Sequence, residues 1–279
     1  MPSDFLHGAN SGGQGGSAYG GAIAVDFGGS REANAFLLHN LISKSEARGW
    51  WGGEGGPSLD HYNGKGGDGG NAFGGAIYVD AGTSAKPGFN VLGGTITMAT
   101  AYGGHGGRGG DTPGARGSFG GSGGNGGWGG DAFGGGIYLG GVSRGSLNST
   151  WSLIDLAINA CVANSAYGAD GGDGFSGGDG GDSGRAQGGG VFTEFGGKVR
   201  ILRSSILDND VIRGLGGQGG KGFIGALDGK KGKATNVYGP GMAVGQSSGV
   251  VEVVDTVIES KKSKINLYVF DPMNRVVYS

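Results

Sequence analysis

Four aspartates in one glycine-rich tract have the residue type and the spacing of calcium ligands. Asp170 and Asp173 lie three residues apart, and Asp179 and Asp182 repeat that interval after a short turn. In an extended chain with three residues per turn, such neighbours share one edge about 9 Å apart, and carboxylate oxygens suit calcium. The calcium-binding nonapeptide GGxGxDxUx is not matched. Charge pairing with the basic residues of the next tract fits the pattern better than calcium binding: Lys221, Lys230, Lys231 and Lys233.

Catalytic and redox chemistry have weaker candidates. Glycan-cleaving sites on parallel strands need clustered Asp, Lys and Arg or a carboxylate pair. The positions predicted to face outward carry one residue per copy and are of mixed charge, which favours a ladder that holds strands in register: Asn90, Asp155, Arg200 and Glu252. The single cysteine, Cys161, falls in an apolar column and is predicted to be a buried hydrophobe. We therefore expect no catalytic activity and no bound cofactor, with calcium as the less favoured alternative.

Composition and spacing argue against several binding classes. No Gly-x4-Gly-Lys-Ser/Thr motif occurs, and the four histidines lack the spacing of a zinc site. A net charge of −2 gives no reason to expect nucleic-acid binding, and no apolar run has the length of a membrane span. The first residues lack the basic and apolar regions of a signal peptide, and Asn148 begins a glycosylation sequon.

Aromatic residues mark the glycine tracts. Tyr62, Phe119 and Phe175 fall in the turns between tracts, where exposed rings would suit contact with a glycan or a protein receptor. Three tryptophans near the bases of the tracts are instead expected to pack between the tracts and the rest of the fold: Trp50, Trp51 and Trp128.

These residues sit in a repeat of five copies. The signature is Ala or Val, one further residue, two glycines and a short apolar run, at residues 18–25, 72–79, 132–139, 186–193 and 237–244, and Pro240 replaces the second glycine in the fifth copy. Its first glycine recurs roughly every 50 to 60 residues, a regularity that indicates an internal repeat. After each signature, apolar and polar residues alternate as in β-strands.

Aligning the copies on their glycines gives two apolar columns, as a solenoid core requires. One is Leu41, Ile96, Cys161, Ile206 and Ile258. The other is Phe36, Val91, Leu156, Ile201 and Val253.

Glycine-rich tracts connect the copies, and 74 of the 279 residues are glycine. Their Gly-Gly-x period of three matches the polyproline-II helix, so two edges stay bare and every x side chain lies on the third. Each tract has a turn in its middle, which predicts hairpins at about 49–70, 103–130, 168–184 and 214–234. Ordered glycine is entropically costly. We expect order because both ends are anchored on strands and neighbours stack alongside.

The signature Gly134-Gly135-Gly136-Ile137-Tyr138 and the segment from Arg203 to Asn209 resemble glycine-rich right-handed parallel β-helix proteins of bacterial surfaces. The Gly-Gly-x tracts are similar to those of mycobacterial glycine-rich surface proteins, springtail antifreeze proteins and the bundled adhesins of phage tail-fibre tips. The resemblance implies a single all-β repeat domain over 1–279. We predict a right-handed parallel β-helix of about five coils, flanked by a stack of polyproline-II hairpins.

The functional expectation is an extracellular or cell-surface scaffold, with a virion as a further setting. A short solenoid leaves open strand edges, so we predict a homo-oligomer or filament, with 261–279 as a cap or an assembly segment. The alternative is a receptor- or glycan-binding adhesin that uses the hairpin tips. Ice binding and polysaccharide cleavage are the less favoured alternatives, since the x positions are charged and irregular.

Overall fold

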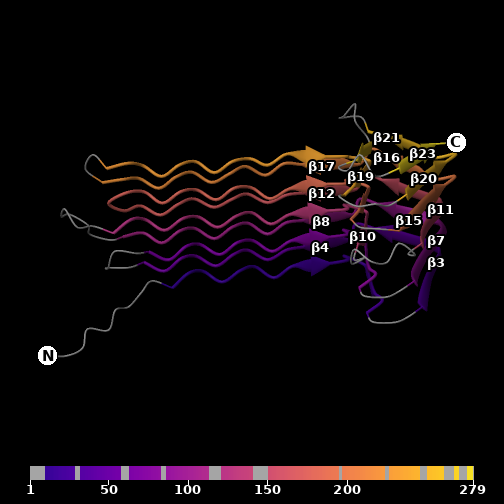
Figure 1. Cartoon of the computed structure of the whole chain (residues 1–279), viewed down its shortest axis with the longest axis horizontal. Coiled ribbons are helices and arrows are strands. Elements are labelled where there is room, and N and C mark those ends of the chain that lie inside the picture. Colours follow the sequence, from indigo (N-terminus) through magenta and orange to yellow (C-terminus); the bar gives the residue numbers. More distant parts are fainter. Residues whose placement is uncertain are drawn as a thin grey trace.

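The computed structural model describes residues 10–28, 32–57, 63–82, 86–112, 121–140, 150–194, 197–223, 226–245, 250–260, 267–269 and 275–278. Every regular element in these ranges is a β-strand, and the strands pair in parallel. Figure 1 shows the strands stacked at one side of the molecule, with extended threads projecting from them. The chain is therefore all-β in the described part, and its stacked parallel strands are compatible with a β-solenoid.

The strands form four sheets, to which successive copies of the repeat add successive strands. The first sheet contains β1 (Ala18–Tyr19), β5 (Ala72–Phe73), β9 (Ala132–Phe133), β13 (Ala186–Gln187) and β18 (Val237–Tyr238). The second contains β2 (Ile23–Asp26), β6 (Ile77–Asp80), β10 (Ile137–Gly140), β14 (Val191–Thr193), β19 (Met242–Val244) and β22 (Leu267–Val269).

The third sheet is the widest. It contains β3 (Glu32–Ser43), β7 (Lys86–Thr97), β11 (Thr150–Asn159), β15 (Lys198–Leu202), β16 (Ser205–Leu207), β20 (Val250–Val254), β21 (Val257–Glu259) and β23 (Arg275–Tyr278). The fourth contains β4 (Glu46–Arg48), β8 (Thr100–Tyr102), β12 (Val162–Asn164) and β17 (Asp210–Ile212).

The repeated glycine of the signature makes the corner between the first two sheets. Gly74 has a φ of 65°, a left-handed conformation that side chains disfavour. A Cβ there would lie 2.1 Å from the Ile77 carbonyl oxygen, so the tight turn needs glycine. The equivalent glycine of every copy has the same sign of φ: Gly20, Gly134, Gly188 and Gly239.

The strands of the third sheet bend at one left-handed residue in each copy. His39, Asp155 and Arg203 have φ of 49°, 53° and 46° at this bend, and Gly93 takes the equivalent place in β7. A residue outside the β region resets the alternation of side chains between the two faces. The periodicity of the sequence must therefore be counted separately before and after the bend.

The pairing register overturns part of both predicted columns. Register in the third sheet aligns Ile42, Ile96, Ile158, Ile206 and Ile258. Ile96, Ile206 and Ile258 are thus in the predicted column, whereas the assignments of Leu41 and Cys161 were wrong. Leu41 is paired with Thr95 and is 77% exposed. In the other column Phe36 and Leu156 were wrong, and their places belong to Leu37 and Leu153.

Cys161 is nevertheless fully buried, as predicted. It lies after a second left-handed residue, Ala160, and its N–H donates to the Asn209 side-chain oxygen (2.8 Å). Burial raises the pKa of its thiol to about 11. The thiol stays protonated near neutral pH, which fits packing and not reactivity.

A second apolar cluster consists of aromatic rings from the first two sheets. Phe73 stacks on Phe133, and Tyr78 stacks on Tyr138 with ring centroids 5.2 Å apart. The Tyr138 hydroxyl donates to the Glu194 carboxylate, and burial raises the pKa of Tyr138 well above its usual value. These stacked rings reinforce the copy-to-copy register that the backbone pairing sets.

The glycine tracts form an ordered array of arms, here called the glycine bundle. Its outgoing arms are 49–57, 103–112, 165–174 and 213–222, and its return arms are 10–17, 63–71, 121–131, 176–185 and 226–236. Figure 1 shows these arms running side by side away from the sheets.

Two families of hydrogen bonds repeat every three residues in the bundle. In one, an outgoing arm bonds to the next outgoing arm, as when Gly52 and Gly55 donate to the carbonyl oxygens of His105 and Arg108. In the other, outgoing and return arms bond to each other, as when Gly107 donates to the Gly67 oxygen (2.8 Å). The three-residue interval is that of a polyproline-II helix. Two of every three N–H groups are satisfied inside the bundle.

Candidate functional site

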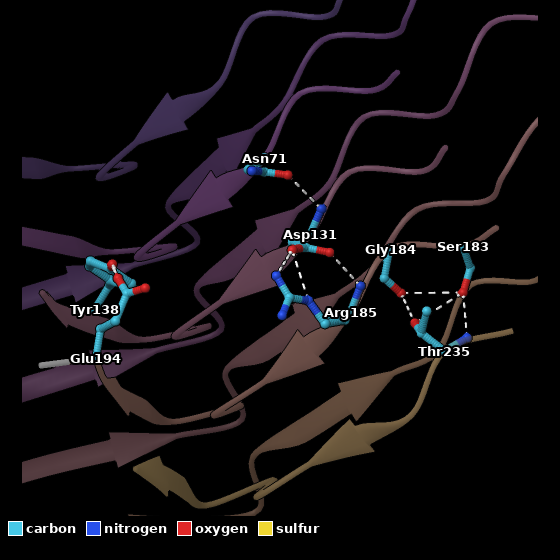
Figure 2. A network of polar contacts seen from close by, with 8 residues as sticks. All are labelled: Asn71, Asp131, Tyr138, Ser183, Gly184, Arg185, Glu194 and Thr235. Carbon is cyan, nitrogen blue, oxygen red and sulfur yellow. Dashed lines mark hydrogen bonds and ion pairs between the residues drawn. The ribbon is translucent and has the colours of Figure 1, made fainter. Parts of the chain in front are cut away.

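The x residues of the Gly-Gly-x tracts form the two outer faces of the bundle. Their backbone N–H groups point away from the neighbouring arms, and a side chain of the preceding arm accepts many of them. Asn71 Oδ1 accepts the Asp131 N–H (2.8 Å), and Asp131 Oδ1 accepts the Arg185 N–H (2.7 Å). Figure 2 shows this series running from arm to arm. Asp and Asn at x positions therefore act as caps that link successive copies.

The four aspartates with calcium-ligand spacing all serve as such caps. Their Oδ1 atoms accept the backbone N–H groups of Gln218, Lys221, Lys230 and Lys233, each at 2.7 Å. Asp170 and Asp173 lie on an outgoing arm, whereas Asp179 and Asp182 lie on a return arm. Among the described residues, no group of three or more carboxylate, histidine or cysteine ligands is placed to hold a metal ion. The structure therefore explains these four carboxylates as acceptors of hydrogen bonds between successive copies of the repeat.

One histidine takes part in the same pattern. His105 Nδ1 accepts the Tyr167 N–H (3.2 Å), and its ring stacks on the Tyr167 ring at 5.2 Å. Burial, and secondarily the nearby Arg48 cation, lowers the pKa of His105. The neutral form is favoured, as an accepting nitrogen requires.

The charged ladder on the third sheet is made of ion pairs between copies. Glu252 binds Lys198 (3.0 Å) and Arg200 (3.1 Å), and Lys198 is the first cause of its lowered pKa. Asp155 is not on this rung, which Ser152 occupies. Asp155 binds Arg203 through both oxygens at 2.8 Å, and that contact lowers the pKa of Asp155. The lowered pKa values fit ionised partners in salt bridges and not a proton-donating acid.

The aromatic residues are distributed differently from the prediction. Tyr62 and Phe119 lie outside the described residues, while Phe175 is exposed at the end of an outgoing arm. The packing role predicted for the three tryptophans was wrong, since Trp50, Trp51 and Trp128 are 76%, 68% and 58% exposed. Trp51 and Trp128 occupy x positions on the two opposite outer faces. The period of three that places x side chains outside predicts the exposure of these two, whereas Trp50 precedes the x position and its N–H donates to the Gly16 oxygen.

One end of the strand stack has open edges. Strands β1, β2, β3 and β4 each pair on one side only within the described part of the chain. The twelve-residue edge of β3 carries the exposed side chains of Phe36, Leu38 and Leu41. At the opposite end, β22 pairs with β19 and β23 pairs with β20, so these strands of the predicted 261–279 segment extend two sheets of their own chain.

Among the described residues, no helix has the length and apolar character to cross a membrane. No known family model matches the sequence, and no curated protein matches it. Among solved structures, the chain is similar to the nine polyproline type II helical bundle springtail antifreeze protein from Granisotoma rainieri, with 18% identity over 85% of this chain and 98% of that one. The TM-score is 0.18, so this likeness carries no argument about fold or function.

Proposed function

We propose that the protein is an extracellular structural or adhesive scaffold without catalytic activity, which associates end to end into oligomers or filaments. The fold that we propose for it is a right-handed parallel β-helix of about five coils, with polyproline-II arms that form one rigid bundle. The observation that carries this proposal is the open end of the strand stack, where β3 has an unpaired edge and exposed apolar side chains.

An unpaired, long and apolar strand edge favours pairing with another chain. The opposite end of the stack supplies a suitable partner, since β22 and β23 belong to the same two sheets as β2 and β3. Pairing of one end with the other is heterologous, so it propagates into a filament when the rotation does not close a ring.

The bundle itself is not expected to join copies. Asp179 caps Lys230, so Lys231 in the last arm corresponds to Gly180 in the preceding return arm. At Gly180 a Cβ would lie 2.2 Å from the Gly217 oxygen of a neighbouring arm. The Lys231 side chain therefore occupies the space into which a further arm would pack. This restricts the proposed contact to the ends of the strand stack.

A pair of variants tests the proposal. We expect Leu41→Asp to weaken self-association at least about tenfold, because it places a charge on the apolar edge. Leu227→Asp, at an equally exposed leucine on the bundle, should leave association unchanged. Sedimentation velocity and negative-stain microscopy across a range of protein concentrations provide the measurement. A wild-type protein that stays monomeric at high concentration, or equal effects of both variants, would contradict the proposal.

A further inference from the structure

The outer face of the return arms contains a polar trough. Its volume is about 500 Å³, within the range typical of small-ligand sites. It crosses the arms, taking lining residues from all five return arms, among them Gln14, Asp68, Trp128, Asp182 and Thr235. Figure 2 shows part of its polar lining, in which side chains from successive arms lie in a row.

The lining is held in place by the caps. Asp68 accepts the Trp128 N–H through Oδ1 (2.9 Å), and Asp182 accepts the Lys233 N–H in the same way. Within the described part of the chain, the second carboxylate oxygen of each has no partner in the bundle. The Asn71 amide likewise uses its oxygen on Asp131, so its NH₂ group is available as a donor. Each of these three caps therefore uses one oxygen in the bundle and leaves its second polar atom available to a ligand in the trough.

Trp128 supplies the apolar part of this lining. Its ring is more than half exposed, and the Lys65 ammonium lies 5.4 Å from the ring centre and 3.2 Å from Asp68. The ring is thus flanked by acceptors and donors that are fixed before any ligand binds. Fixed polar groups around an exposed indole suit a ligand with an apolar face and many hydroxyls.

The charge of the trough limits the class of ligand that it can bind. Three aspartates line it, and Arg185 is occupied by Asp131 through a short ion pair (2.6 Å). Lys65 is likewise paired with Asp68. The remaining acidic character of Asp182 disfavours sulfated or otherwise anionic chains. We propose that this trough binds a neutral oligosaccharide chain that lies across the return arms.

Calorimetric titration with cellohexaose, maltohexaose, mannohexaose and hexa-N-acetylchitohexaose, all of them uncharged, tests this site. We expect at least one to bind with a Kd between about 10 µM and 1 mM, and Trp128→Ala to weaken it at least about tenfold. Trp128→Phe keeps a ring and should retain part of the affinity. Trp51→Ala removes an equally exposed indole from the opposite face and should change nothing.

Several outcomes would overturn the assignment. They are no saturation by any of the four sugars at 10 mM, unchanged binding in Trp128→Ala, an equal loss in Trp51→Ala, or tighter binding of a heparin hexasaccharide. Circular dichroism and thermal melting of each variant show whether it is folded. Because Trp128 is exposed and its N–H bond to Asp68 comes from the backbone, the alanine variant should keep the wild-type melting temperature.

Discussion

Replacing Gly107 with alanine should destabilise the protein by about 3–5 kcal/mol, which lowers the melting temperature by roughly 10 °C. A Cβ at this position would lie 1.9 Å from the Gly53 carbonyl oxygen, and both atoms belong to backbones held between other arms. The arms must therefore separate. The bond from Gly107 to the Gly67 oxygen and the bond from Gly67 to the Gly53 oxygen would then weaken together.

Gly13→Ala is the matched control, because a Cβ at Gly13 meets nothing within 4 Å. This variant should be neutral or gain up to about 1 kcal/mol, since alanine reduces the entropy of the unfolded chain. Thermal and urea melts of both variants provide the comparison. If the Gly107→Ala and Gly13→Ala variants were equally stable, the arms would not be packed so closely that only glycine fits between them.

Replacing Trp151 with alanine should also cost about 3–5 kcal/mol. Trp151 is 2% exposed and lies in β11 between Phe89 of β7 and Val199 of β15. Its ring contacts the rings of Phe27 and Phe89, with centroids 6.3 and 6.5 Å away. Removing it leaves a cavity that backbone-paired strands on both sides cannot close.

Trp50→Ala serves as the control for that loss, since Trp50 is exposed at the base of an outgoing arm. It should change the free energy of unfolding by less than about 1 kcal/mol. Urea unfolding followed by circular dichroism measures both. If the Trp151→Ala variant were as stable as the Trp50→Ala variant, Trp151 would not be packed in a core between the sheets.

Much of the strand stack could be predicted from the sequence because each copy repeats the same signature. The glycine corner, the apolar residues that follow it and the Gly-Gly-x period recur at matched positions. The two apolar columns failed at Leu41, Phe36 and Leu156 because alignment on the following glycines puts the first and third copies out of register. Both columns shift together in each of these copies, so the predicted spacing across the bend was correct. In the third copy the arm begins at Ser165 in place of a glycine, which displaces any alignment made on glycines.

The role of the bundle aspartates was harder to predict. Spacing places Asp170 and Asp173 on one edge, but it does not distinguish a metal ligand from a cap for a backbone N–H in the next arm. That distinction depends on how the arms pack, which the period alone leaves open. The trough was missed for the same reason, since its lining comes from five arms separated by whole copies of the repeat.

The central claim is that the glycine-rich arms are held together by hydrogen bonds in the glycine bundle. Site-resolved amide hydrogen exchange on the wild-type protein tests this claim most directly. In arm 103–112 we predict strong protection for Gly106, Gly107, Gly109 and Gly110, whose N–H groups donate to neighbouring arms. The x residue Arg108, for which no acceptor is found in the described residues, should exchange much faster, giving a period of three. Fast, uniform exchange along this arm would contradict the account.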